Sequence, residues 1–335
     1  MRELTGPVAA DQLDSVLRGS EPVLLRGLVA HWPVVRAAAQ EADGVSAYLR
    51  RFDVGATVGA WFGPPEIEGR FGYTEDFSGF NFQREKLPLA AVLDQLARHE
   101  ANQQPPAIYV GSTTIDACLP GFRAENDIDL GQADAQQAAL ASLWLGNRTV
   151  VAAHHDLPDN LACVVAGHRR FTLLPPGEVG NLYIGPLEHT LAGQPTSLVD
   201  FTRPDLARFP KFAQAMEHAQ IAELGPGDAL FIPSLWWHHV EATDAFNLLV
   251  NYWWRQSPSD MDSPMAALLL AIMSVRDLPP AQRDAWNSLF DHYVFDADAT
   301  TAEHLPPAAR QVLAAPLDSN AIRALRARLI RRLNR

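Results

Sequence analysis

Short apolar runs separated by glycine, asparagine or proline fill much of the second half of this 335-residue chain, and they constrain the fold most strongly. Short runs bounded by turn-forming residues are typical of β-strands. They occur at 142–145, 150–154, 161–166 and 170–174, and again at 222–224, 229–232, 238–241 and 246–253. A series of short strands joined by turns predicts a small barrel or jelly roll.

The flanking segments have other patterns. A strand is expected at 22–27, and helices at 11–17, 33–50, 88–99, near 205–218, and at 264–275, 280–292, 306–314 and 319–334. Residues 54–82 are rich in glycine, proline and aromatic residues, which predicts short strands and loops, and 116–137 reads as mostly loop. The sequence therefore predicts one β-rich domain at 1–257, with its barrel core at about 107–255, and a helical tail at 258–335.

Composition narrows the class of protein. The net charge is −12, which argues against a general nucleic-acid binder, because such a protein carries a basic surface. The two cysteines exclude a disulfide framework and a cysteine-rich zinc site, and they fit a reducing compartment. The N-terminus lacks the apolar core of a signal peptide, and the longest apolar run, near 265–273, is too short to cross a bilayer. We therefore expect a cytoplasmic protein without a membrane segment.

The last predicted helix is amphipathic. Its apolar face carries Ile322, Leu325, Leu329, Ile330 and Leu333, and arginines occupy much of the rest. Three interpretations stay open: a solvated helix packed on the barrel, a helix that forms a homodimer, or a contact with nucleic acid.

The sequence His154-His155-Asp156 ends one of the predicted strands. Because alternate residues of a strand point the same way, His154 and Asp156 can aim at one point while His155 turns away. With His238 from another strand, they make a set of two imidazoles and one carboxylate. Such a set leaves about three metal positions open and suits Fe(II) that binds O2 together with a second ligand. The alternative for the first pair is a surface turn, because Leu157 and Pro158 follow.

A second stretch supports the metal site. Gly227-Asp228 precedes an apolar strand, a proline and an aromatic-flanked His238, in the sequence PGDALFIPSLWWHHVEAT. Together with PVLLRGLVAHWP, LWLGNRTVVAAHHDLPDNLACVVAGHRRFTLLPP and NLLVNYWWR, it resembles the JmjC-type, cupin-8-like family of Fe(II)- and 2-oxoglutarate-dependent oxygenases. The resemblance covers roughly residues 20–255 and is greatest to the branch of the factor-inhibiting-HIF asparaginyl hydroxylase.

The resemblance implies a fold and a set of site residues. The fold class is mainly β with helical additions: a double-stranded β-helix of the cupin or jelly-roll type, with an N-terminal α/β elaboration and a C-terminal helical tail. His154, Asp156 and His238 match the Fe(II)-binding triad. Tyr109, Asn160, Arg169 and Asn251 match positions that contact or adjoin the co-substrate 2-oxoglutarate. Trp253 and His239 are assigned to the substrate pocket; His155 and His239 are alternatively structural neighbours of the ligands.

Two positions depart from the family pattern. Arg169 stands where the family often has a lysine that binds the distal carboxylate of 2-oxoglutarate. Arginine is also cationic and can hold a carboxylate with two hydrogen bonds, but its planar head is not equivalent to an ammonium group. Val151 replaces a common threonine, so its hydrogen bond is missing or comes from Thr149 or Thr172.

The resemblance implies a dioxygenase that hydroxylates a protein or peptide side chain and releases succinate and CO2. Removal of an N-methyl group starts from the same hydroxylation. No side chain beyond the metal site is expected to act as an acid or base. Two alternatives stay open: the same chemistry on a small molecule or nucleotide, and a non-catalytic cupin that holds a metal such as zinc. A homodimer through the C-terminal helices is a further expectation, and nucleic acid is not an expected partner.

Overall fold

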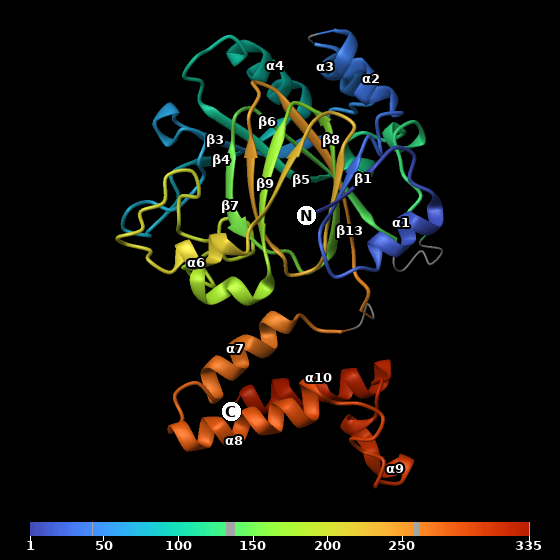
Figure 1. The fold of residues 1–335 in the computed structure, drawn as a ribbon, viewed down its shortest axis with the longest axis vertical. Coiled ribbons are helices and arrows are strands. Elements are labelled where there is room, and N and C mark those ends of the chain that lie inside the picture. Colours follow the sequence, from blue (N-terminus) through green and yellow to red (C-terminus); the bar gives the residue numbers. More distant parts are fainter. Residues whose placement is uncertain (42, 132–137, 258–260, 335) are drawn as a thin grey trace. The chain divides into compact units, whose positions relative to one another are not determined.

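The computed structural model describes residues 1–41, 43–131, 138–257 and 261–334. The chain divides into two compact units, Met1–Gln256 and Ser257–Arg335 (Figure 1). The first contains the sheets, and the second contains helices.

Two sheets build the first unit, and their strands come from distant parts of the chain. The larger sheet has the order β1-β2-β11-β8-β13-β6-β5-β3-β4, and the smaller has the order β10-β9-β12-β7. The strands are β1 (Arg2–Thr5), β2 (Val23–Arg26), β3 (Thr57–Gly63), β4 (Gln83–Pro88), β5 (Ala107–Thr114), β6 (Leu140–Gly146), β7 (Val150–His154), β8 (Asp159–Ala166), β9 (Arg169–Leu174), β10 (Gln220–Leu224), β11 (Ala229–Ile232), β12 (Trp237–Ala242) and β13 (Asn247–Trp254). This is the predicted jelly-roll fold.

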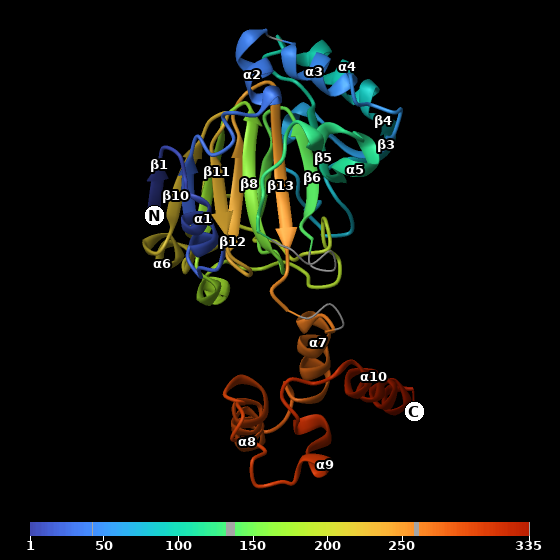
Figure 2. The same cartoon turned by 90° about the vertical axis from the view of Figure 1, so that its right-hand side faces the viewer.

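The two faces of the larger sheet explain its apolar strands. On its inner face, Ala162, Val164 and Leu230 join Phe171 and Leu173 of the smaller sheet in one buried cluster. Its outer face packs against helices α1 (Ala10–Leu17), α2 (Pro33–Gln40), α3 (Gly44–Arg50) and α4 (Leu89–His99). Every residue of β8 is consequently buried, because a strand covered on both sides needs apolar residues at successive positions. β8 lies beside β13, and β13 beside β6 (Figure 2).

The second unit contains α7 (Pro264–Ser274), α8 (Pro280–Phe290), α9 (Pro307–Arg310) and α10 (Ser319–Leu333). Side-chain caps mark two of the starts: Ser263 Oγ accepts from Met265 N, and Asp318 accepts from the backbone at the start of α10. These four helices bury none of their described residues. No helix among the described residues is long and apolar enough to cross a bilayer.

Several sequence predictions need correction. Strands β1 and β4 were not expected, because they are edge strands whose exposed polar and charged residues mask the strand pattern. The helix near 205–218 is limited to α6 (Phe212–Glu217), because the Asp205 carboxylate accepts from the N–H groups of Ala207 and Arg208 and forms a turn there. The helix at 306–314 ends at Arg310 and continues as a 3-10 turn, Gln311–Leu313. Part of the loop at 116–137 forms α5 (Ile115–Cys118), and 132–137 lie outside the described residues.

Candidate metal centre

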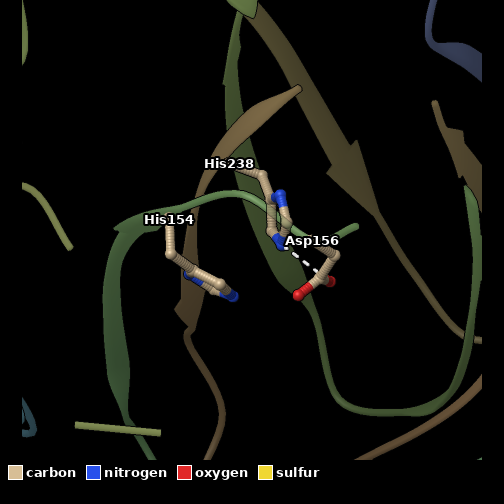
Figure 3. Close-up of side chains that lie close together, drawn as sticks. All are labelled: His154, Asp156 and His238. Atoms are coloured by element: carbon tan, nitrogen blue, oxygen red, sulfur yellow. Dashed lines mark ion pairs between the residues drawn. The ribbon is translucent and has the colours of Figure 1, made fainter. Parts of the chain in front are cut away.

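His154, Asp156 and His238 converge in the first unit, inside the barrel (Figure 3). One possible ligand atom from each residue lies within 4.8 Å of the other two. His238 Nε2 is 3.6 Å from Asp156 Oδ2. His155 does not belong to this group: its ring packs edge-on against Trp237, at 4.7 Å between centroids. The structure therefore brings together the three side chains that the sequence singled out.

The structure corrects how the first two ligands are aligned. Strand β7 ends at His154, so Asp156 lies in the following loop rather than at an alternate strand position. His154 instead reaches the interior through an irregularity in the ladder, where His238 pairs with His154 but Val240 pairs with Val151. The extra residue in β7 places His154 on the same face as Val151, which a regular strand would not do.

Hydrogen bonds fix the loop that carries Asp156. Leu235 N donates to the Asp156 carbonyl at 2.9 Å, and Ser234 Oγ donates to the Leu157 carbonyl at 2.6 Å. Ser234 N in turn donates to Asp159 Oδ1 at 2.8 Å. Because residues 233–236 lead directly into β12, these bonds hold the carboxylate ligand at a fixed place relative to His238.

The protein also selects the metal-binding form of both histidines. His154 Nδ1 lies 2.9 Å from the Ala152 carbonyl, and His238 Nδ1 lies 3.0 Å from the Trp236 carbonyl. A carbonyl can only accept, so each Nδ1 carries a hydrogen, and Nε2 is the ring nitrogen that each histidine can offer to a metal. Burial, together with the neighbouring His154, lowers the pKa of His238 to about 4. His238 is therefore neutral at neutral pH, which is the form that binds a metal.

A cavity extends from the triad between the two sheets, with an empty volume of about 420 Å³ that includes space open to solvent. The triad lines it together with five other residues that were predicted for the co-substrate or substrate: Tyr109, Asn160, Arg169, Asn251 and Trp253. Val151 also lines it, with no hydroxyl to offer. Neither Thr149 nor Thr172 is among the lining residues, so neither supplies the hydrogen bond that Val151 lacks.

Arg169 is a buried cation without an acidic partner among the described residues. Arg169 is buried, its Nε has no hydrogen-bond partner, and its Nη2 makes only a long 3.4 Å bond to the Trp144 carbonyl. Burial lowers the pKa of Arg169 to about 10, so the guanidinium remains charged at neutral pH. The Trp253 indole N–H is also buried and unpartnered. A cavity with these free donors fits an anionic ligand rich in acceptors, as 2-oxoglutarate is.

Tyr109 and His239 have different environments. Tyr109 lines the cavity beside Arg169, and burial raises the pKa of its hydroxyl, which stays protonated. His239 points to the other face of β12, where its ring stacks on Phe201 at 4.6 Å, and it does not line the cavity. The assignment of His239 to the substrate pocket is therefore corrected, because successive side chains of a strand face opposite ways. Burial lowers the pKa of His239 to about 3, as expected for a structural histidine.

Five residues that line the cavity were not singled out in the sequence: Trp144, Ala162, Phe171, Val240 and Leu249. Trp144 lines the cavity, packs edge-on against Trp253 at 5.5 Å between centroids, and donates its indole N–H to Asn251 Oδ1 at 2.6 Å. In the sequence it is one apolar residue in a strand of apolar residues, and no local signal separates it from the core.

Comparisons with known proteins agree with this geometry. The sequence profile of the cupin-like domain matches residues 9–260. The chain is 29% identical to lysine-specific demethylase 8 of Xenopus tropicalis over 248 residues, which are 72% of this chain and 49% of that protein. It is 27% identical to the human bifunctional peptidase and (3S)-lysyl hydroxylase JMJD7, over 76% of this chain and 86% of that protein.

A shorter match is to a protein whose name refers to tRNA and not to lysine. The tRNA wybutosine-synthesizing protein 5 of Danio rerio is 38% identical over 107 residues, which are 32% of this chain and 30% of that protein. The chain thus spans about half the length of the frog demethylase and less of the fish protein. The profile match covers most of the chain, so the protein belongs to the cupin-like, JmjC-like domain family.

Proposed function

We propose that the protein is an Fe(II)- and 2-oxoglutarate-dependent dioxygenase that hydroxylates a protein or peptide side chain. One observation carries this proposal: a site for a divalent metal and an unpaired buried guanidinium line the same cavity. Arg169 pairs with Ala242, four positions along β12 from His238, which corresponds to about 13 Å of strand. An arginine side chain and a five-carbon dicarboxylate together can bridge that span to the metal.

In this proposal, Fe(II), 2-oxoglutarate and O2 would together supply the chemistry: one oxygen atom of O2 enters succinate as 2-oxoglutarate loses CO2, and the other converts the substrate C–H bond to C–OH. The protein contributes positions and surroundings. His154, Asp156 and His238 would hold the metal. Arg169 and Asn160 offer donors to the co-substrate. The aromatic rings of Trp144 and Trp253 pack edge-on and form an apolar part of the cavity wall.

A protein substrate is supported by the relatives. One is named a (3S)-lysyl hydroxylase and another a lysine-specific demethylase. Hydroxylation of an N-methyl group is the first step of demethylation, so one cavity chemistry serves both reactions. The net charge of −12 disfavours a nucleic-acid substrate.

The proposal predicts a visible metal-to-ligand charge-transfer band when Fe(II) and then 2-oxoglutarate are added to the apo protein without oxygen. The measurement needs no substrate, so the unknown target does not matter. The band should be absent from the His154→Ala variant, which removes one metal ligand. Bound iron without a band in the wild-type protein would contradict bidentate binding of 2-oxoglutarate and favour the non-catalytic alternative.

We also propose that two copies associate through the second unit. Its exposed apolar side chains include Leu268, Leu269, Met273, Trp286, Leu289, Val294, Phe295, Leu329, Ile330 and Leu333. On the apolar face of α10, Ile322 and Leu325 are half-buried, but Ile330 and Leu333 are exposed, so the second unit covers this face only in part. The free buried thiols Cys118 and Cys163 support a cytoplasmic location.

Replacing both Ile330 and Leu333 with aspartate is expected to halve the particle mass measured by light scattering. Charged residues in the middle of an apolar interface oppose association, since they would be desolvated without partners. The matched control is Arg331→Glu, which changes charge on the same helix outside its apolar stripe and should leave the mass unchanged. A wild-type monomer, or an unchanged mass in the double variant, would count against this dimer.

A further inference from the structure

A chain of three side chains crosses the inner face of the larger sheet. Trp144 on β6 donates its indole N–H to Asn251 Oδ1 at 2.6 Å. Asn251 on β13 donates its Nδ2–H to Asn160 Oδ1 on β8 at 3.2 Å. These residues are diagonal neighbours across adjacent ladders, because Trp144 pairs with Leu249 and Asn160 pairs with Trp253. All three line the metal cavity.

The chemistry of the first member fixes the orientation of the other two. An indole N–H can only donate, so the atom of Asn251 that faces Trp144 must be its carbonyl oxygen. The amide nitrogen of Asn251 then faces Asn160, where it requires an oxygen. The Asn160 amide therefore turns its Nδ2 hydrogens away from Asn251, and Asn160 lines the cavity. If only other amide groups contacted Asn251, either orientation of its amide could form hydrogen bonds, and the orientation of Asn160 would not be fixed.

We infer that Trp144 is a positioning residue that, through Asn251, keeps the N–H2 end of Asn160 available to an anionic ligand in the cavity. This inference rests on the proposed function, because it assumes that 2-oxoglutarate is that ligand. With its carbonyl oxygen turned into the cavity, Asn160 would repel a carboxylate. With its nitrogen there, it donates a hydrogen bond to a charged acceptor, which is stronger than a bond between neutral groups.

Because Asn251 and Asn160 are buried, the orientation of their amide groups affects ligand binding. Asn251 is 1% exposed and Asn160 is 7% exposed, so water does not readily replace a broken link. The Trp144 carbonyl also accepts from Arg169 Nη2 at 3.4 Å. Trp144 thus contacts Arg169 through its backbone and orients Asn160 through its side chain. The positions of these two hydrogen-bond donors in the cavity therefore depend on this one residue of β6.

The test is anaerobic titration of the Fe(II)-loaded protein with 2-oxoglutarate, read from the charge-transfer band, and calorimetry with the Mn(II)-loaded protein. Trp144→Phe keeps an aromatic ring but removes the N–H. The Kd for 2-oxoglutarate is expected to rise about tenfold, the effect of one hydrogen bond to a charged group, with unchanged affinity for the metal. The matched control is Trp32→Phe, which also breaks a buried indole bond, from Nε1 to the Asp127 carbonyl at 3.1 Å, but lies outside the cavity.

A double-mutant cycle separates positioning from direct contact. Asn251→Leu should weaken 2-oxoglutarate binding by itself, and Trp144→Phe should then add less than about twofold, because the link through which it acts is already broken. If Trp144→Phe does not fold, Asn251→Leu still tests the middle link. A wild-type Kd in a folded Trp144→Phe variant, a wild-type Kd in Asn251→Leu, or an equal effect of Trp144→Phe in both backgrounds would overturn the inference. Failure of the wild-type protein to bind 2-oxoglutarate would instead contradict the proposed function.

Discussion

Fe(II) binding is expected to fall by more than about 100-fold when His238 is replaced by alanine. Loss of a hydrogen-bonding neighbour of a metal ligand alone costs about 10- to 100-fold in affinity, so loss of the ligand itself should cost more. Only His154 and Asp156 would remain, and His154 comes from an edge strand and Asp156 from a loop. Anaerobic competition against a chelator of known affinity measures the change.

The neighbouring histidine provides a matched control for this experiment. His239→Ala removes the same ring one residue later, but on the face of β12 that stacks on Phe201. Its Fe(II) affinity should remain that of the wild-type protein. Both histidines are buried, so each variant should lose about 1–3 kcal/mol of unfolding free energy, and thermal melting establishes that both are folded. Loss of iron from His239→Ala, or wild-type iron binding by His238→Ala, would contradict the assignment of the two faces.

Most of the strands that line the cavity were predictable, because they are short apolar runs between turn residues. β8 is the clearest example: residues 161–166 were predicted, and Asp159–Ala166 form the strand. β4 was not predictable in this way, because Gln83–Pro88 lie at the edge of the larger sheet and five of the six residues are polar or exposed. A strand at an edge does not need the apolar pattern by which a sequence reveals strands.

The site was predicted only in part, for a similar reason. Local motifs and a family resemblance identify His154, Asp156 and His238, but a regular strand would place His154 and Val151 on opposite faces. Only the irregular pairing of β7 with β12 turns His154 inward, and no period in the sequence signals it. The link from Trp144 to Asn160 depends on the order of β6, β13 and β8, which are not consecutive in the chain. Such contacts are set by topology and register, which a residue pattern does not encode.

Arg169→Met is expected to have opposite effects on binding and on stability. The Kd for 2-oxoglutarate should rise about 100-fold, because the variant loses about two charge-assisted hydrogen bonds, and the Fe(II) affinity should not change. The same variant, measured without ligand, should be as stable as the wild-type protein or more stable, by about 1–4 kcal/mol. A buried charge without an acidic partner costs free energy, which a methionine of similar length avoids.

A variant of the adjacent Arg170 tests whether the effect is specific to Arg169 or follows from the loss of any positive charge on β9. Arg170 is exposed on the other face of β9, so Arg170→Met removes the same charge without entering the cavity, and it should change neither quantity. Added 2-oxoglutarate should raise the melting temperature of the metal-loaded wild-type protein but not that of Arg169→Met, because ligand binding stabilises only a protein that binds. Wild-type affinity in Arg169→Met would remove this arginine from the co-substrate site. A large loss of stability in Arg169→Met would mean that groups of the protein already stabilise the guanidinium. Its charge would then not be available to an anionic ligand.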